Sequence, residues 1–218
     1  MIPVIAIDGP SASGKGTVAQ LVAQELGFHY LDSGALYRIV ALAAKNRSIS
    51  WQDESALAKL APSLDIRFEK DAILVDGLDV SNEVRTEEMG RGASEVAVHP
   101  ALRRALLDLQ HSFRKAPGLV ADGRDMGSVV FPDAALKIYL TASTKTRAQR
   151  RYKQLMSKGI HANLPDIFQD LQKRDARDQQ RSAAPLQQCA DAKLLETSDL
   201  TIEQAVQAVL QHYRDSTA

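Results

Sequence analysis

The chain has 218 residues, 44% hydrophobic and 25% charged, a balance typical of a folded globular protein and not of a disordered one. Its 27 lysines and arginines equal its 27 aspartates and glutamates, so it lacks the basic excess of proteins that coat nucleic acid. Its single cysteine, Cys189, excludes an intramolecular disulfide, and no apolar run reaches the roughly 20 residues of a membrane span. We expect a cytoplasmic protein that binds neither membranes nor polynucleotides.

The chain begins with a predicted strand, a glycine-rich loop and a helix. The apolar run 4–7 shows no alternation, which is typical of a strand buried on both faces of a parallel sheet. Residues 15–26 carry apolar side chains at helical spacing, and Gly27 supplies a stop. The loop between them is made of Gly9, Pro10, Ser11, Ala12, Ser13, Gly14, Lys15, Gly16 and Thr17.

This loop has the pattern of a P-loop, which binds the phosphates of ATP. Its glycines let the backbone wrap closely, so that successive N–H groups point inward, and the helix start adds its positive dipole end. Lys15 stands where its ammonium group can reach the β- and γ-phosphates, and a merely structural turn would not require it.

One departure concerns magnesium. The general pattern has Ser or Thr directly after the lysine, but here Gly16 comes before Thr17. The variant resembles the loop of nucleoside monophosphate kinases, in which Mg²⁺ is held largely through waters and nucleotide phosphates. This implies no direct protein ligand. Thr17 and Asp122 are expected nearby, although a turn or capping role for Asp122 stays open.

A second strand, predicted at 28–31, leads into a possible phosphate contact. Ser33 at a helix start and Arg38 one turn later offer hydroxyl, N–H and guanidinium donors. A plain helix cap with a surface arginine is the alternative.

The middle of the chain has a different pattern. Residues 64–68 alternate with period two, 72–75 do so loosely, and Asp76-Gly77 is a tight-turn signal before a short third strand at 78–81. We expect a small antiparallel sheet inserted at about 60–90. A helix over 100–115 follows.

A third strand of the parallel sheet, predicted at 119–121, ends in charged residues between two glycines. Arg124 and Asp125 would lie at the carboxyl edge of the sheet, where such folds bind ligands. A structural ion pair is the alternative.

A further strand, predicted at 136–140, precedes two groups of arginines. The first group is Arg147, Arg150 and Arg151, and the second is Arg174, Arg177 and Arg181, with Asp178 between its members. A solvated charged face is the usual explanation of such spacing. Beside a nucleotide loop, however, converging arginines would neutralise two phosphate chains and the charge that develops during transfer.

The chain closes with a strand at 193–195 and a helix that opens with a capping box, Thr201 to Gln204. Alternating strands and helices predict an α/β fold. There is no Ser-His-Asp order and no metal-binding His/Cys spacing. A phosphate acceptor needs no general base, because its second pKa of about 6 leaves it mostly ionised at neutral pH. The absence of an evident base therefore favours a phosphate nucleophile.

Taken together, these motifs resemble the bacterial cytidylate kinase family over nearly the whole chain. The matching runs are I-D-G-P-S-A-S-G-K-G-T, L-D-S-G-A-L-Y-R, A-D-G-R-D-M-G-S-V-V-F-P-D-A and K-R-D-A-R-D-Q-Q-R. The third run is the most specific, since many kinases share the phosphate loop. The resemblance implies transfer of the ATP γ-phosphoryl group to CMP or dCMP with Mg²⁺, by a monomer.

The resemblance also implies an architecture. It is a single domain, 1–218, of the P-loop NTPase type with five parallel strands. The core would comprise 1–33, 115–145 and 165–218, with an acceptor-binding insertion at 34–114 and a lid at 146–164.

Residue roles follow from the same resemblance. Lys15 would keep its role at the donor phosphates. The acceptor phosphate would contact Ser33, Arg38, Arg124 and Arg181. The cytosine edge would contact Ser94 and Arg103, with Asp125 nearby, and the ribose hydroxyls would contact Asp178. Arg174, with the lid arginines Arg147 and Arg151, would serve the transferring phosphate. Spacing alone would not select Ser94 or Arg103.

Two alternatives to (d)CMP phosphorylation stay open. The first is a P-loop kinase of another small acceptor, either a different nucleoside monophosphate or a hydroxyl compound with Asp32 as base. The second is a protein that binds ATP without transferring phosphate.

Overall fold

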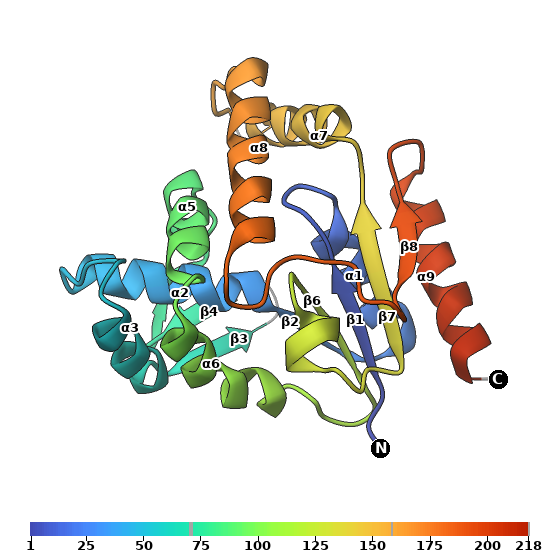
Figure 1. Cartoon of the computed structure of the whole chain (residues 1–218), viewed down its shortest axis with the longest axis horizontal. Coiled ribbons are helices and arrows are strands. Elements are labelled where there is room, and N and C mark those ends of the chain that lie inside the picture. Colours follow the sequence, from blue (N-terminus) through green and yellow to red (C-terminus); the bar gives the residue numbers. More distant parts are fainter. Residues whose placement is uncertain (70–71, 158, 218) are drawn as a thin grey trace. The chain divides into compact units, whose positions relative to one another are not determined.

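The computed structural model describes residues 1–69, 72–157 and 159–217, which form two compact units (Figure 1). Unit 1 comprises Met1–Leu31 and Phe113–Ala218, and unit 2 comprises Asp32–Ser112. The core, insertion and lid boundaries inferred from the sequence remain predictions.

Unit 1 is built on the predicted five-stranded parallel sheet, which is confirmed. Its order is β2-β6-β1-β7-β8, and β1 pairs in parallel with both β6 and β7, as β7 does with β8. Every residue of β1 and β6 is buried, which explains why their sequences do not alternate. The strands are β1 (Val4–Asp8), β2 (His29–Asp32), β6 (Leu119–Gly123), β7 (Leu136–Thr141) and β8 (Lys193–Glu196).

Helices α1 (Lys15–Leu26) and α9 (Ile202–Thr217) pack against each other and against the sheet. Their apolar faces, with Val22 and Val209 fully buried, join Ile5 and Ile138 in one hydrophobic core. The capping box of α9 is confirmed: Thr201 N donates to Gln204 Oε1 at 2.9 Å, and Gln204 N donates to Thr201 Oγ1 at 3.2 Å.

Two long helices follow β7 and pack on each other, α7 (Thr144–Ser157) and α8 (Leu164–Gln180). They lie at the end toward which β1 and β7 point, beside the loop that follows β1 (Figure 1). A single π-helical turn, η2 (Met126–Val130), follows β6 and was not predicted. The carboxyl edge of the sheet thus brings together the phosphate loop and the two helices that carry the arginine groups.

Unit 2 combines helices with the predicted antiparallel sheet, whose order is β3-β4-β5. The strands are β3 (Ile66–Glu69), β4 (Ala72–Val75) and β5 (Leu78–Asp79). Its helices are α2 (Ser33–Asn46), α3 (Glu54–Leu60), the short η1 (Ala61–Ser63), α4 (Ser81–Val84), α5 (Glu87–Val96) and α6 (Pro100–Ser112). The tight turn is confirmed, because Asp76 and Gly77 both have left-handed φ angles, 51° and 82°.

Two predicted boundaries in unit 2 were wrong. The third strand ends at Asp79 instead of 81, because the Asp79 carboxylate accepts a hydrogen bond from Ser81 N at 2.9 Å and turns the chain into α4. The helix predicted to reach 115 ends at Ser112, whose hydroxyl donates to the Leu109 carbonyl at 2.7 Å in place of a further helical turn.

Candidate active site

The phosphate loop has the backbone geometry of an anion-binding nest. Ala12 and Gly14 have left-handed φ angles of 59° and 91°, and such left-handed residues turn successive N–H groups toward one side. Gly9 is required for a different reason: a Cβ there would lie 2.0 Å from the Leu140 carbonyl oxygen of β7. The loop is therefore fixed against the sheet at one end and shaped for phosphate at the other.

Three polar side chains of the loop are buried. Lys15 is 8% exposed, Ser11 is 6% exposed and Ser13 is 1% exposed. Ser13 Oγ has no hydrogen-bond partner among the described residues, whereas most buried hydroxyls have one. We expect Ser13 Oγ to find its partner in a bound phosphate.

Asp122 lies beside the start of α1. It is 4% exposed and accepts a 2.6 Å hydrogen bond from the Tyr30 hydroxyl. A Cβ on Gly16 would stand 3.7 Å from the nearer Asp122 carboxylate oxygen, while Thr17 is exposed. Across the described residues, no three His, Cys, Asp or Glu side chains are grouped to bind a metal ion.

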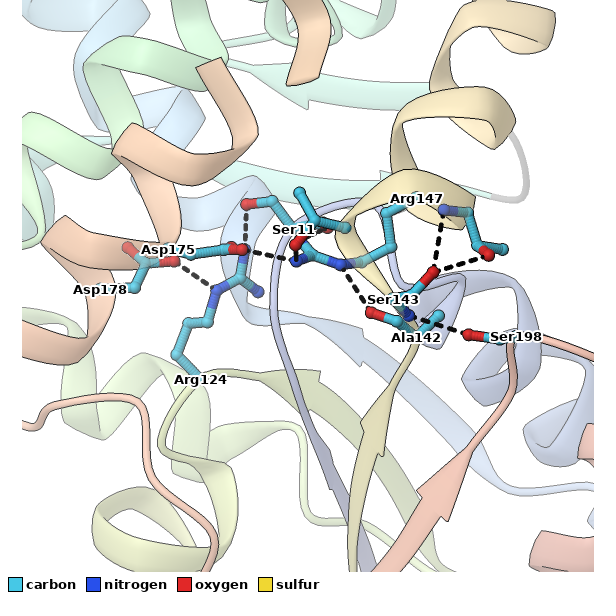
Figure 2. A network of polar contacts seen from close by, with 10 residues as sticks. Ser11, Arg124, Ala142, Ser143, Arg147, Asp175, Asp178 and Ser198 are labelled. Carbon is cyan, nitrogen blue, oxygen red and sulfur yellow. Dashed lines mark hydrogen bonds and ion pairs between the residues drawn. The ribbon is translucent and has the colours of Figure 1, made fainter. Parts of the chain in front are cut away.

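Arg124 joins the phosphate loop to helix α8 (Figure 2). Its guanidinium donates to Ser11 Oγ at 2.8 Å, to the Gly123 carbonyl at 3.1 Å and to Asp178 at 2.7 Å. Burial would lower the pKa of Arg124, but the charge and hydrogen bond of Asp178, together with the charges of Asp122 and Asp175, outweigh it and raise the pKa. Arg124 is therefore a fixed positive charge at the loop.

Asp178 is surrounded by arginines. Burial would raise the pKa of its carboxyl, but Arg124, followed by Arg181 and Arg174, lowers it, so Asp178 is ionised at neutral pH. Arg181 donates to the Ala184 carbonyl at 2.7 Å, and its Nη2 lies 4.0 Å from the buried Asp125 carboxylate. The structure thus brings together five predicted site residues: Arg124, Asp125, Arg174, Asp178 and Arg181.

The arginines of α7 differ in their surroundings. Arg147 is 4% exposed and donates to the carbonyls of Ala142 and Ser11 at 2.9 and 3.0 Å, and to Asp175 at 2.6 Å (Figure 2). Arg147 Nη2 also donates to Thr144 Oγ1 at 3.0 Å. These bonds direct Arg147 to the protein framework rather than outward.

Arg150 and Arg151 continue along the same helix. Arg150 donates to the Ser13 carbonyl at 3.1 Å and to both oxygens of Thr197. Arg151 donates to Gln154, and its pKa is lowered by burial and by the charge of Arg174. The charges of Arg151 and Arg174 therefore act on each other across α7 and α8.

Sequence reasoning missed Asp8. Its two carboxylate oxygens accept hydrogen bonds from Met126 N and Gly127 N, each at 2.8 Å, and so anchor η2 next to Arg124. Burial raises the pKa of Asp8 to about 6. The signal was present, because Asp8 is a charged residue that ends an otherwise apolar buried strand.

Four of the predicted site residues belong to unit 2. Two of them, Ser33 and Arg38, form hydrogen bonds within this unit. Ser33 Oγ donates to Gln110 Oε1 at 2.8 Å. Arg38 Nη1 donates to the carbonyls of Val84 and Thr86 at 3.0 and 3.1 Å, so it is not a plain surface arginine.

The two residues expected to read cytosine also have defined surroundings. Arg103 donates to the Ala97 carbonyl at 3.1 Å and lies over the Tyr37 ring, 5.5 Å from its centre. Ser94 Oγ is buried and has no hydrogen-bond partner within the described part of the chain. A ligand would satisfy this hydroxyl.

A nest between β1 and α1, a buried lysine and arginines at the carboxyl edge of a parallel sheet define a P-loop kinase fold. Solved structures share this architecture at low identity. A gluconokinase from Sinorhizobium meliloti 1021 is 12% identical with a TM-score of 0.50, covering 98% of this chain and 93% of its own. An uncharacterized protein from Eubacterium ventriosum is 12% identical with a TM-score of 0.56, covering 99% of both chains.

Sequence comparison narrows this class to one family. The cytidylate kinase family model matches residues 5–215. A cytidylate kinase of Polynucleobacter asymbioticus is 59% identical over 100% of this chain and 99% of its own. One from Burkholderia vietnamiensis is 60% identical over 97% of this chain and 93% of its own. The chain belongs to the cytidylate kinase family, and it is a kinase.

The length and apolar character of the helices give a separate finding. None of the helices in the described ranges combines the length and the apolar character that crossing a bilayer requires.

Proposed function

We propose that the protein transfers the γ-phosphoryl group of ATP to CMP or dCMP, giving ADP and CDP or dCDP. One observation carries the proposal: Arg124 is hydrogen-bonded both to Ser11 of the phosphate loop and to Asp178 among the arginines of α8. The residues for the donor phosphates and those for an acceptor nucleotide therefore meet at one guanidinium.

On the donor side, the loop from Gly9 to Thr17 binds the β- and γ-phosphates through its backbone N–H groups, which only Pro10 lacks, and the α1 start adds its dipole. Lys15 neutralises the phosphoryl group as it moves. Ser13 Oγ, buried without a protein partner in the described residues, supplies one further donor.

On the acceptor side, the nucleophile is a phosphate oxygen that is mostly ionised at neutral pH, so no side chain has to remove a proton. The family resemblance assigns the binding of this phosphate to Ser33, Arg38, Arg124 and Arg181. Asp178, kept ionised by its arginines, accepts hydrogen bonds from the ribose hydroxyls.

Cytosine recognition is assigned to Ser94 and Arg103, with Asp125 nearby. The unsatisfied hydroxyl of Ser94 supports its part in this assignment. Arg174, Arg151 and Arg147 serve the transferring phosphate, where charge spreads over the equatorial oxygens. Arg151 and Arg174 are the neighbouring pair on α7 and α8 that best fits this role.

Kinases of this kind use ATP together with Mg²⁺, and the residues present fit that ion. The buried carboxylate of Asp122 and the hydroxyl of Tyr30 lie beside Gly16 at the start of α1, and oxygen groups of this kind suit an ion that keeps several waters. Asp122, with Thr17 nearby, would bind the ion through water, and the ion would neutralise phosphate charge. Neutral net charge and the lone cysteine support a cytoplasmic protein that binds no nucleic acid, and the family resemblance implies a monomer.

An acceptor panel tests the proposal. ATP and Mg²⁺ would be incubated with CMP, dCMP, UMP, AMP, GMP and a set of sugars, and the products separated by anion-exchange chromatography. We expect CDP and dCDP together with equimolar ADP. Phosphorylation of neither CMP nor dCMP would refute the proposal.

The same panel separates the alternatives. A sugar phosphate whose formation is abolished by Asp32→Asn would show a hydroxyl kinase. The structure disfavours this, because Asp32 Oδ1 already accepts from Ala35 N at 3.0 Å as the cap of α2. Tight ATP binding without any product would show a nucleotide-binding protein.

A further inference from the structure

Two arginines of α7 reach the backbone of the phosphate loop instead of its side chains. Arg147 Nη1 donates to the Ser11 carbonyl at 3.0 Å, and Arg150 Nη1 donates to the Ser13 carbonyl at 3.1 Å. Both contacts span more than a hundred residues of sequence, 136 and 137 positions respectively. Helix α7 therefore holds the loop from outside at two points.

The orientation of a carbonyl determines that of the next N–H. A trans peptide is planar, and its C=O and N–H point in opposite directions. When the Ser11 carbonyl points out toward Arg147, the N–H of Ala12 in the same peptide points the other way. In the same way, when the Ser13 carbonyl points out toward Arg150, the N–H of Gly14 points the other way.

Each of these two peptides is followed by a residue with a left-handed backbone. Ala12 and Gly14 are the two left-handed residues of the loop, with φ angles of 59° and 91°. Ala12 carries a side chain in a region that costs L-residues roughly 1–2 kcal/mol. A hydrogen bond from outside the loop that favours one orientation of each peptide therefore opposes this conformational cost.

Both arginines are themselves held in place. Arg147 is 4% exposed and is bonded to Ala142, Thr144 and Asp175, while Arg150 is bonded to both oxygens of Thr197 after β8. Ser143 caps this end of α7 by accepting from Thr146 N at 3.1 Å, and its own N–H donates to Ser198 Oγ at 2.9 Å (Figure 2).

We propose that Arg147 and Arg150 are positioning residues that orient the Ser11–Ala12 and Ser13–Gly14 peptides, so that the N–H groups of Ala12 and Gly14 face the ATP phosphates. Arg147 thus serves the transferring phosphate through the backbone of the loop. This role rests on the proposed binding of ATP at this loop, and it adds Arg150 to the residues that matter there.

The main test is Arg150→Ala, because Arg150 is only partly buried and its loss should leave the chain folded. Dissociation constants for ATP and for CMP would be measured separately by calorimetry. We expect the ATP constant to rise about tenfold and the CMP constant to change less than twofold. Arg150→Lys, which can still donate one hydrogen bond to the Ser13 carbonyl, should recover part of the loss.

A matched control is Arg114→Ala. Arg114 also donates to a backbone carbonyl of unit 1, Ile2 O at 2.9 Å, and pairs with Asp133, but it lies before β6 and not on the phosphate loop. We expect it to lower the melting temperature without changing ATP affinity. A second readout is the Gly14 amide signal in ¹⁵N NMR, whose shift on ATP addition should shrink in Arg150→Ala and not in Arg114→Ala.

The outcomes are distinguishable. Folded Arg150→Ala that binds ATP within twofold of the wild type would overturn the inference while leaving the proposed function intact. Equal weakening of ATP binding by Arg114→Ala would also overturn it, since that would show a general effect of stability. A wild-type protein that does not bind ATP would refute the proposed function, and the inference with it.

Discussion

Replacing Asp8 by asparagine tests how the end of β1 supports the site. Asp8 is 6% exposed, and its carboxylate accepts from Met126 N and Gly127 N, which fixes η2 beside Arg124. Burial raises its pKa from 3.8 to about 6, even though both amide bonds act in the opposite direction. Asparagine keeps the shape but cannot ionise, so the comparison isolates the charge.

The expected change in unfolding free energy follows from the pKa of Asp8. Between pH 3.8 and about 6, the folded state binds more protons at Asp8 than the unfolded state does, so the unfolding free energy falls as the pH rises. A rise of the pKa from 3.8 to about 6 corresponds to about 3 kcal/mol at pH above 6. The hydrogen bond lost in Asp8→Asn adds an offset of about 1–3 kcal/mol that does not depend on pH.

The assay is urea unfolding of the wild type and Asp8→Asn at pH 4, 5, 6 and 7. The unfolding free energy of the wild type minus that of the variant should fall by up to about 3 kcal/mol from pH 4 to pH 7. A difference that rises over this range would refute the reasoning, because it would show that the two amide bonds outweigh burial and lower the pKa.

Three further predictions concern the phosphate loop and cytosine recognition. Gly9→Ala should destabilise the fold by about 3 kcal/mol or more in urea unfolding, because its Cβ would lie 2.0 Å from the Leu140 carbonyl. The control is Gly16→Ala, whose Cβ would have ordinary contacts. It should be neutral or stabilising by up to about 1 kcal/mol. Lys15→Ala should lower kcat at least about 100-fold in a coupled ADP assay while the far-ultraviolet circular dichroism stays unchanged. Ser94→Ala should raise the KM for CMP about 5- to 10-fold and leave the KM for ATP unaltered, and equal changes in both would count against a base contact.

The features that the sequence predicted well are those with local causes. The phosphate loop depends on glycines and a lysine within nine neighbouring positions, Gly9 to Thr17. Short apolar runs were enough to predict the buried strands, and Thr201 and Gln204 were enough to predict the capping box of α9. In each case, the residues that determine the structure are close together in the chain.

The features that it missed depend on distant contacts. Helix α5 contains Gly90 and Gly92, which weaken a helical pattern, yet a Cβ on Gly92 would lie 2.7 Å from the Trp51 ring. Glycine is needed there for close packing, which only the folded unit reveals. Likewise, nothing near Arg147 in the sequence shows that it binds the Ser11 carbonyl rather than solvent.

The family resemblance supplied what local patterns could not. Ser94 is an ordinary small residue in a helix by its sequence, and it was selected only through the resemblance. The structure now gives it an independent physical mark, a buried hydroxyl without a hydrogen-bond partner among the described residues. Asp175, which pairs with Arg147 at 2.6 Å, was selected by neither route.

The most direct measurement follows the transferred group itself. ATP labelled in its γ-phosphoryl group would be incubated with CMP, and the product examined by ³¹P NMR and by radiochemical chromatography. The account predicts that the label appears as the β-phosphoryl group of CDP, in equal amount to the ADP formed. Label that remains in ATP, or appears only as inorganic phosphate or on a hydroxyl oxygen, would contradict it.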